Sequence, residues 1–364
     1  MMRTVLLGDV IELAYGKSLP QRSRVSGRFP VFGSNGQVDT HNKSLVGGPG
    51  IIVGRKGSVG EVIWSKQDFW PIDTTYYVKL KNPDDDLRYW YYVLKILGLN
   101  KLNSHSAIPG LNRDVAYIKQ VPLRSTLEQE KIANILGSLD EKIELNRRMN
   151  ETLEQLGQAL FRHYFVDNPE AKNWESGRVS DVVSIYSGFA FKSKDFDING
   201  KYGLVTIKNV QDGSFIKDCT DHLSEPSPDK TPEYIHLKSG DIILSLTGNV
   251  GRVCIVVGRD YLLNQRVAKL VSDESQAYVY FLFRSKIMKG RMVGISKGTA
   301  QKNLSPIETG KLKIKIPPTN IMSQFEEIAI NLLNMIVSNN EQIQNLTSLR
   351  DTLLPKLISG EIEV

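Results

Sequence analysis

Two long stretches of the chain carry apolar residues at alternating spacings of three and four, which is the period of an amphipathic helix. One runs from Thr126 to about His163 and the other from Thr319 to about Gly360. At 1.5 Å per residue, a helix of about 38 residues is about 57 Å long. Neither helix has a partner in its own part of the chain, so the two are predicted to pair as an antiparallel coiled coil. The apolar positions assigned to this interface are Ile132, Ile135, Leu139, Ile143, Leu153, Leu160, Ile328, Leu332, Ile343, Leu346, Leu353 and Leu357.

The start of the first long helix carries a clear capping signal. Ser125 and Thr126 are each followed three residues later by an acid or amide, Glu128 and Gln129. This spacing lets side chains at a helix start satisfy free backbone amides reciprocally. In the second helix, Pro355 is expected to kink or shorten the last turns, because proline removes a backbone donor.

The remainder of the chain repeats one pattern twice, in the same order. The matched segments are Leu7–Val10 with Val179–Val182, Tyr15–Lys17 with Tyr186–Gly188, Gly57–Gly60 with Gly248–Gly251, Tyr77–Leu80 with Val267–Leu270, and Ile118–Pro122 with Ile314–Pro318. Between them lie short runs rich in Val and Ile, bounded by Gly, Asn and Asp, which predict strands. One helix is predicted at Leu87–Leu97 and its counterpart at Ala277–Met288.

These patterns predict an α+β fold with a pseudo-two-fold internal repeat. Two similar globular domains of mixed strands with few helices would be separated by two long helices. Antiparallel pairing of the helices would place one globular domain at each end of a rod. The predicted boundaries are 1–124 for the first domain, 125–166 for the first helix, 167–178 for a linker, 179–318 for the second domain, 319–360 for the second helix and 361–364 for a tail.

Composition adds few constraints. The net charge of +6 and the pI near 9.0 are compatible with a polyanionic partner and equally with many ordinary proteins. Only Cys219 and Cys254 are present, which excludes a disulfide framework or a CxxC-type zinc site and favours two buried free thiols. The start of the chain lacks a signal-peptide pattern and no apolar run approaches membrane-spanning length, so a soluble cytoplasmic protein is expected.

The catalytic signatures of related chemistry are absent from the sequence. There is no phosphate-binding G-x-x-x-x-G-K-[ST] loop, no glycine-rich cofactor motif and no Asn or Asp followed by Pro-Pro-aromatic, as amino-methylating enzymes use. The five histidines are scattered, and residues 84–86 read as a solvated acidic turn before a helix. We therefore expect no catalytic residue, metal or cofactor in this chain.

Two variable domains alternating with two repeated long helices resemble the specificity subunits of type I restriction-modification systems. The resemblance covers nearly the whole chain. It is carried by Glu128–Ile132 and Leu139–Asn146 in the first helix and by Leu353–Ile362 at the C-terminal end. The second helix departs from the pattern, because it has Asn334–Asn340 where a match to Leu139–Lys142 would stand.

The resemblance implies a function that composition and spacing do not show. Each globular domain would be a target-recognition domain that reads one half of a bipartite asymmetric target in double-stranded DNA. The helices would set the spacer and dock two modification (methyltransferase) subunits, and restriction subunits would join through the complex. S-adenosylmethionine would then belong to the methyltransferase partner, and ATP and magnesium to the restriction partner. The departure in the second helix puts the symmetry of docking in doubt.

Polar clusters beside predicted turns are the candidate DNA contacts, because sequence readout needs donors and acceptors at base edges and cations on phosphate. In the first domain they are Lys17, Arg22, Arg24, Asn35, Lys43, Arg55, Lys56, Ser58, Thr74, Thr75, Ser104 and His105. In the second they are Lys192, Lys194, Thr247, Asn249, Arg252, Asn264, Gln265, Arg266, Lys297, Thr299, Gln301, Lys302 and Asn303. Solvated loops and strand-end hydrogen bonds are the alternative interpretation of these residues. The alternative functions are a coiled-coil scaffold whose two heads bind protein or carbohydrate, and a nuclease with an undetected site.

Overall fold

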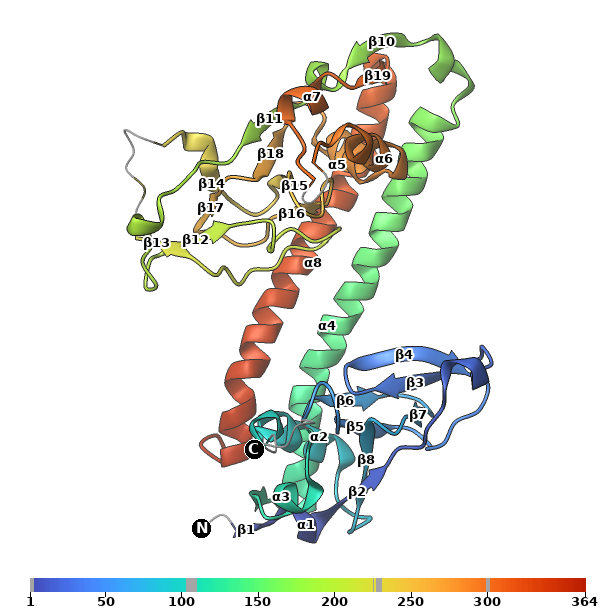
Figure 1. Ribbon diagram of the computed structural model, residues 1–364, viewed down its shortest axis with the longest axis vertical. Helices are drawn as coiled ribbons and strands as arrows, with labels where there is room; N and C mark the ends of the chain where they lie inside the picture. Colours follow the sequence, from blue (N-terminus) through green and yellow to red (C-terminus); the bar gives the residue numbers. More distant parts are fainter. Residues whose placement is uncertain (1–2, 103–109, 225, 227–230, 299–301) are drawn as a thin grey trace. The chain divides into compact units, whose positions relative to one another are not determined.

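The computed structural model describes residues 3–102, 110–224, 226, 231–298 and 302–364 (Figure 1). The chain divides into two compact units, each with its own core. Unit 1 comprises Met1–Lys142 and Leu346–Val364, and unit 2 comprises Ile143–Asn345. Both long helices, α4 (Thr126–Phe161) and α8 (Thr319–Ser359), therefore contribute one part to each unit.

Unit 1 is built on a four-stranded antiparallel sheet in the order β2-β8-β5-β6. A smaller sheet, β4-β3-β7, and the pair β1-β9 complete its strands. Its elements are β1 (Arg3–Leu6), α1 (Leu7–Val10), β2 (Ile11–Tyr15), β3 (Phe29–Gly33), β4 (Gly36–His41), β5 (Gly50–Gly54), β6 (Val62–Ser65), β7 (Trp70–Pro71), β8 (Thr75–Leu80), α2 (Leu87–Ile96), α3 (Arg113–Tyr117) and β9 (Gln120–Leu123).

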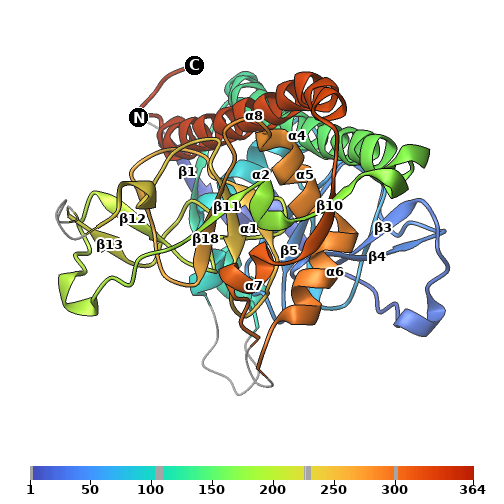
Figure 2. The same cartoon turned by 90° about the horizontal axis from the view of Figure 1, so that it is seen from above.

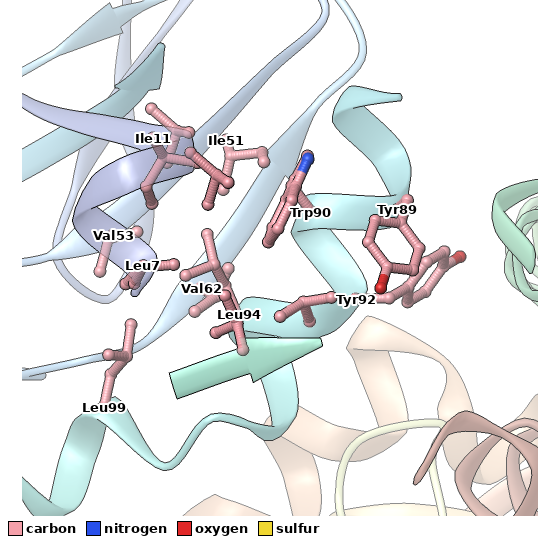
Figure 3. Close-up of a cluster of buried hydrophobic side chains, with 14 of the residues drawn as sticks. Leu7, Ile11, Ile51, Val53, Val62, Tyr89, Trp90, Tyr92, Leu94 and Leu99 are labelled. Atoms are coloured by element: carbon pink, nitrogen blue, oxygen red, sulfur yellow. The ribbon is translucent and has the colours of Figure 1, made fainter. Parts of the chain in front are cut away.

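Helix α2 covers one face of the four-stranded sheet and forms the centre of the unit 1 core. Trp90 and Leu94 on α2 lie with Ile51 and Val62 from the sheet in one buried cluster (Figure 3). The start of α4 and the end of α8 pack on the same cluster through Leu136 and other apolar side chains. The end of the second long helix is thus part of the first domain's core.

Unit 2 repeats this framework with different additions. Its main sheet has the order β11-β18-β15-β16, and the pair β10-β19 corresponds to β1-β9. The smaller sheet, β13-β12-β17-β14, has a different order and strand number. The elements are β10 (Glu175–Arg178), β11 (Ser184–Ser187), β12 (Tyr202–Val205), β13 (His222–Leu223), β14 (His236–Leu237), β15 (Ile242–Ser245), β16 (Val253–Ile255), β17 (Tyr261–Leu263), β18 (Val267–Val271), α5 (Gln276–Arg284), α6 (Lys286–Ile295), α7 (Pro306–Gly310) and β19 (Lys313–Ile316).

Helix α5 occupies in unit 2 the place that α2 has in unit 1, between the main sheet and the long helices (Figures 1 and 2). Phe161 from α4 and Phe325 from α8 meet in this core with ring centres 6.1 Å apart. The predicted repeat, the mixed strands and the two long helices are therefore confirmed.

The two long helices pair antiparallel in each unit, as predicted, but polar side chains make much of the contact. In unit 1, Arg350 Nη1 lies 2.8 Å from Asp140 Oδ1. In unit 2, the Asn146 amide donates to Gln342 at 3.2 Å, and Asn150 donates to Asn340 at 2.9 Å. The apolar stripe accordingly alternates with layers of amide and ion-pair contacts.

Two residues assigned to the helix interface are wrongly placed. Ile135 is 38% exposed and Ile328 is 45% exposed, while the neighbouring Leu136 and Ala329 are buried. A spacing of three or four is compatible with two adjacent helix faces, and packing against α2 and α5 selects the other one. Of the remaining predicted positions, three are buried and seven half-buried: Ile132, Ile143 and Leu357, then Leu139, Leu153, Leu160, Leu332, Ile343, Leu346 and Leu353.

The predicted ends of the helices meet mixed outcomes. The capping box forms as predicted between Ser125 and Glu128, but Gln129 turns inward and accepts from the Asp86 amide at 2.9 Å. Helix α8 continues through Pro355 to its end, so the predicted shortening is wrong. The single helix predicted at Ala277–Met288 is wrong as well. Ser285 has an extended backbone and caps α6, which splits the segment into α5 and α6.

Two repeat alignments are also wrong: Tyr77–Leu80 is shifted by two residues, and Tyr15–Lys17 by one, because Gly16 and not Lys17 corresponds to Gly188. Gly16 donates to the Thr75 carbonyl at 3.0 Å, and Gly188 donates to the Val267 carbonyl at 2.9 Å, so Thr75 is equivalent to Val267. This makes Lys269 the counterpart of Tyr77. A shift of two residues keeps every side chain on its own face of a strand, so the apolar pattern could not expose the error.

Candidate nucleic-acid interface

The β5–β6 and β15–β16 connections form the two glycine turns of the repeat. Gly57 and Gly60 have φ of 80° and 74°, and Gly248 and Gly251 have φ of 68° and 80°. Residues other than glycine rarely adopt these backbone angles. A Cβ at Gly60 would also lie 2.3 Å from the backbone nitrogen of Asn100. The glycines are needed for the backbone conformation of the turns. Contacts with a ligand would therefore be made by the side chains around them.

A second turn, the one that enters β8 or β18, lies against each glycine turn. The Arg55 amide donates to the Thr74 carbonyl at 2.9 Å, and the Leu246 amide donates to the Arg266 carbonyl at 2.9 Å. The same backbone hydrogen bond therefore fixes the two turns together in both units. It brings the predicted candidates Arg55 and Thr74 to one place in unit 1, and Arg266 to the equivalent place in unit 2.

Arginine and tyrosine side chains gather at this place in unit 1. The Arg55 guanidinium lies 5.0 Å from the Tyr15 ring centre and 6.0 Å from that of Tyr76, and donates to the Asp73 carbonyl at 3.2 Å. Arg113, at the start of α3, lies 5.0 Å from the same Tyr15 ring. Burial raises the pKa of Tyr76 to about 12, so this phenol stays neutral. Arg113 was missed, because no local pattern links it to Tyr15, which lies far away in the sequence.

Three further candidates of unit 1 lie on or beside the glycine turn, and a fourth is committed to the fold. The Ser58 hydroxyl donates to the Asn35 side-chain oxygen at 3.3 Å, and Lys56 is exposed. Thr75 is completely buried, and its hydroxyl donates to the Ile72 carbonyl at 2.8 Å. The turn therefore carries the amide of Asn35, the hydroxyl of Ser58 and the ammonium group of Lys56, whereas the Thr75 hydroxyl makes a strand-end hydrogen bond inside the protein.

The basic candidates that precede the glycine turn of unit 1 in the sequence differ in their exposure. Arg24 is only 14% exposed and pairs with Asp39 at 3.3 Å. The Thr40 backbone amide and the Arg24 guanidinium hold the pKa of Asp39 below its usual value. Lys17, Arg22 and Lys43 are exposed. Ser104 and His105 lie outside the described residues.

In unit 2, a short two-stranded contact brings basic and amide residues to the glycine turn. Lys297 and Asn303 exchange backbone hydrogen bonds of 2.9 and 2.8 Å, and the Gly248 amide donates to the Lys302 carbonyl at 3.2 Å. Thr247 is buried and forms a bridge with Asn303. Lys297, Lys302 and Asn303 are exposed beside the turn. Thr299 and Gln301 lie outside the described residues.

The other unit 2 candidates on these turns differ in their exposure and in their hydrogen bonds. Asn264 accepts from the Gln265 amide at 2.8 Å and so holds its own turn. Gln265, Arg266 and Asn249 are exposed, and Arg252 is half-buried. Asn249 accepts from the Arg252 guanidinium, which also donates to Gln211, so the amide of Gln265 and the guanidinium of Arg266 are left without such a contact. Amides and guanidinium groups read adenine and guanine edges.

Two aromatic side chains beside the lysine candidates of unit 2 belong partly to the core. Phe189 and Phe191 are half-buried, meet with ring centres 5.0 Å apart and pack on a buried cluster. Together with Lys192 and Lys194, whose side chains are exposed, they line a cavity of about 520 Å³. The two phenylalanines therefore pack on the core, and the lysines face solvent.

The described residues contain no group of three or more His, Cys, Asp or Glu side chains that could hold a metal ion. No helix in the described part of the chain is long and apolar enough to cross a membrane. Both cysteines are free, and burial raises the pKa of Cys219 to about 11. What each unit offers is a set of guanidinium, ammonium and amide groups around a rigid pair of turns, which suits base edges and phosphates.

Comparison with known proteins gives matches along nearly the whole chain. Residues 2–155 and 171–347 match the family model described as Type I restriction modification DNA specificity domain. The type I restriction enzyme MjaIX specificity subunit of Methanocaldococcus jannaschii is 27% identical over 343 residues, covering 86% of this chain and 78% of that protein. The MjaVIII specificity subunit of the same organism is 24% identical over 396 residues, covering 99% and 92%.

A solved structure shares the fold. The crystal structure of the type I restriction-modification system S subunit from M. genitalium superposes with a TM-score of 0.68 over 98% of this chain and 96% of that one. Its sequence is 19% identical, so this likeness concerns the fold alone.

Proposed function

This chain belongs to the family of type I restriction modification DNA specificity domains, and from that membership we propose how its two domains divide the work. The chain is a specificity subunit of a type I restriction-modification system, a DNA-recognition protein that is not itself an enzyme. The alternative of a scaffold for protein or carbohydrate ligands has no support in the comparisons.

Residues 1–124 and 179–318 are the two target-recognition domains, each of which reads one half of a bipartite, asymmetric site in double-stranded DNA. One observation carries this proposal: the same four-stranded sheet and pair of turns occurs in both units, with different side chains on the turns. A shared framework with different exposed donors suits two different half-sequences. The contacts are drawn from the exposed or half-buried candidates around the turns, which are Asn35, Arg55, Lys56, Ser58 and Thr74 in the first domain and Asn249, Gln265, Arg266, Lys297, Lys302 and Asn303 in the second.

The long helices, 125–166 and 319–360, set the spacer between the half-sites and dock two modification subunits, with restriction subunits joining through the complex. Both helices contribute residues to both units, which supports a role in setting the spacer. S-adenosylmethionine is the cofactor of the methyltransferase partner, and ATP and magnesium serve the restriction partner. The amide-rich Asn334–Asn340 segment, which hydrogen-bonds to Asn150 through Asn339 and Asn340, supports two docking faces that differ.

The decisive experiment assembles the chain with its modification subunits and maps methylated adenines in DNA. We expect one interrupted target, and binding that weakens steeply as salt rises, because Lys and Arg displace counterions from phosphate. Methylation without a bipartite target, or binding that ignores salt, would contradict the proposal.

The spacer role has its own test. Inserting one matched heptad into both helices should lengthen the preferred spacer and leave both half-sequences unchanged. The control inserts the heptad into one helix only, which breaks the polar pairing and should impair assembly. Altered half-sequences after the matched insertion would refute the role of the helices as a ruler.

A further inference from the structure

In each unit, a backbone hydrogen bond joins the glycine turn to the second turn, and one of the two residues in this bond is an arginine. In unit 1 it is Arg55, whose amide donates to the Thr74 carbonyl. In unit 2 the equivalent donor is Leu246, and the arginine is the acceptor residue, Arg266. The arginine is therefore the donor residue of this backbone hydrogen bond in unit 1 and the acceptor residue in unit 2.

In unit 1 the guanidinium is held rigidly by its surroundings. The rings of Tyr15 and Tyr76 and the Asp73 carbonyl fix Arg55 from several directions. The structural counterparts of the two tyrosines in unit 2 are Ser187 and Ala268, which are too small to seat a guanidinium. An arginine at the Leu246 position would therefore lack this support.

Unit 2 holds its arginine by the backbone instead. Arg266 has φ of 73° and occupies the third position of a turn in which the Val267 amide donates to the Asn264 carbonyl at 3.3 Å. Glycine or asparagine is favoured at such a position, and an arginine there is strained. Among the described residues, only Asp260 is another non-glycine with positive φ.

No side-chain contact in the described part of the fold compensates this strain. The Arg266 side chain is exposed and makes no hydrogen bond or ion pair with another described residue. Asp260, by contrast, pairs with Lys201 at 3.4 Å. A strained residue without an internal partner points to a contact outside the chain.

We propose that Arg55 and Arg266 are the guanine-reading residues of the first and second recognition domain, one in each half-site. This rests on the proposed function. A guanidinium presents two parallel donors that match O6 and N7 of guanine in the major groove, which an ammonium cannot reproduce. Each domain thus places one guanidinium at the hydrogen bond that joins its glycine turn to its second turn. The arginine lies on the glycine turn in the first domain and on the second turn in the second domain.

The test in the second domain uses the assembled methylating complex and the variants R266G and R266K. Both variants should lose discrimination between guanine and adenine at one position of the second half-site, by about 5- to 150-fold in methylation rate. R266G should melt at or above the wild-type temperature, because glycine relieves the strained turn. A residue kept for stability would instead lower the melting temperature when replaced.

D260G is the matched control, because it relieves the same backbone strain in a turn that carries no candidate contact. It should leave discrimination at both half-sites unchanged. In the first domain, R55K keeps the charge and should relax one guanine position of the first half-site alone, by a similar factor.

Two outcomes would overturn the inference. Lysine variants that keep discrimination and lower binding uniformly, with a salt slope reduced by about one, would make these arginines phosphate anchors. A wild-type target without guanine at the affected positions would exclude guanine reading directly. A wild-type complex with no bipartite target would contradict the proposed function itself, which is a separate result.

Discussion

Gly157→Ala is expected to destabilise unit 2 although alanine favours helices. Gly157 lies within α4 and faces Phe281 of α5. A Cβ at this position would lie 2.0 Å from Cζ and 2.2 Å from Cε1 of that ring. Phe281 is completely buried and in edge contact with Tyr280 and Phe325, so the ring has no free space to enter.

The magnitude follows from two opposing terms. Replacing glycine by alanine inside a helix contributes about 1 kcal/mol of stability. Inserting a methyl group into a packed core costs about 1–3 kcal/mol, and contacts as short as these favour the upper end. The net expectation is a loss of about 2 kcal/mol in the free energy of unfolding of unit 2.

Gly137→Ala is the matched control in the same helix. Its Cβ would lie 2.5 Å from Cζ of Arg88, which is the far end of a flexible side chain. Arg88 can swing away at the expense of its hydrogen bonds to the Gly137 carbonyl and Glu141. The gain in helix propensity offsets this loss, so we expect stability within about 1 kcal/mol of wild type.

Hydrogen exchange measured by mass spectrometry resolves the two variants locally. Gly157→Ala should speed exchange in Gln276–Arg284, and Gly137→Ala should leave that segment unchanged. Calorimetric melting of both variants gives the sign of the stability change. Slower exchange or a higher melting temperature in Gly157→Ala would refute the close packing of α4 on α5.

Three further predictions concern single contacts. Ser125→Ala should cost about 1 kcal/mol at pH 7. Hydrogen bonds from Ser125 hold the pKa of Glu128 below its usual value, so this stabilisation is present above the unfolded pKa and is lost as the pH falls through the folded one. Urea unfolding near pH 7 and pH 4 should show the difference shrinking, and a constant difference would contradict it. Glu326→Ala should cost about 1–3 kcal/mol, because its carboxylate accepts at 2.8 and 3.0 Å from the first amides of α5; melting checks this, with Glu326→Gln as a milder control. A double-mutant cycle on Asp140 and Arg350 should give a coupling of about 1 kcal/mol, and zero coupling would exclude a stabilising ion pair between the helices.

The sequence by itself determined the long helices and the repeat, because both are carried by local spacing. The three-and-four periodicity and the Ser125 cap locate the start of α4 without any knowledge of its partners. The glycines at 57 and 248 identify equivalent turns, because each needs a backbone that other residues rarely adopt. The repeated framework could be recognised for the same reason.

The tertiary structure alone decided which faces and which side chains are used. The exposure of Ile135 and Ile328 depends on α2 and α5, which pack on the neighbouring helix face. The meeting of Arg55, Arg113 and Tyr15 joins residues from three distant segments, and no spacing rule links them. Local patterns report backbone periodicity, whereas a site is made by side chains that only folding brings within contact distance.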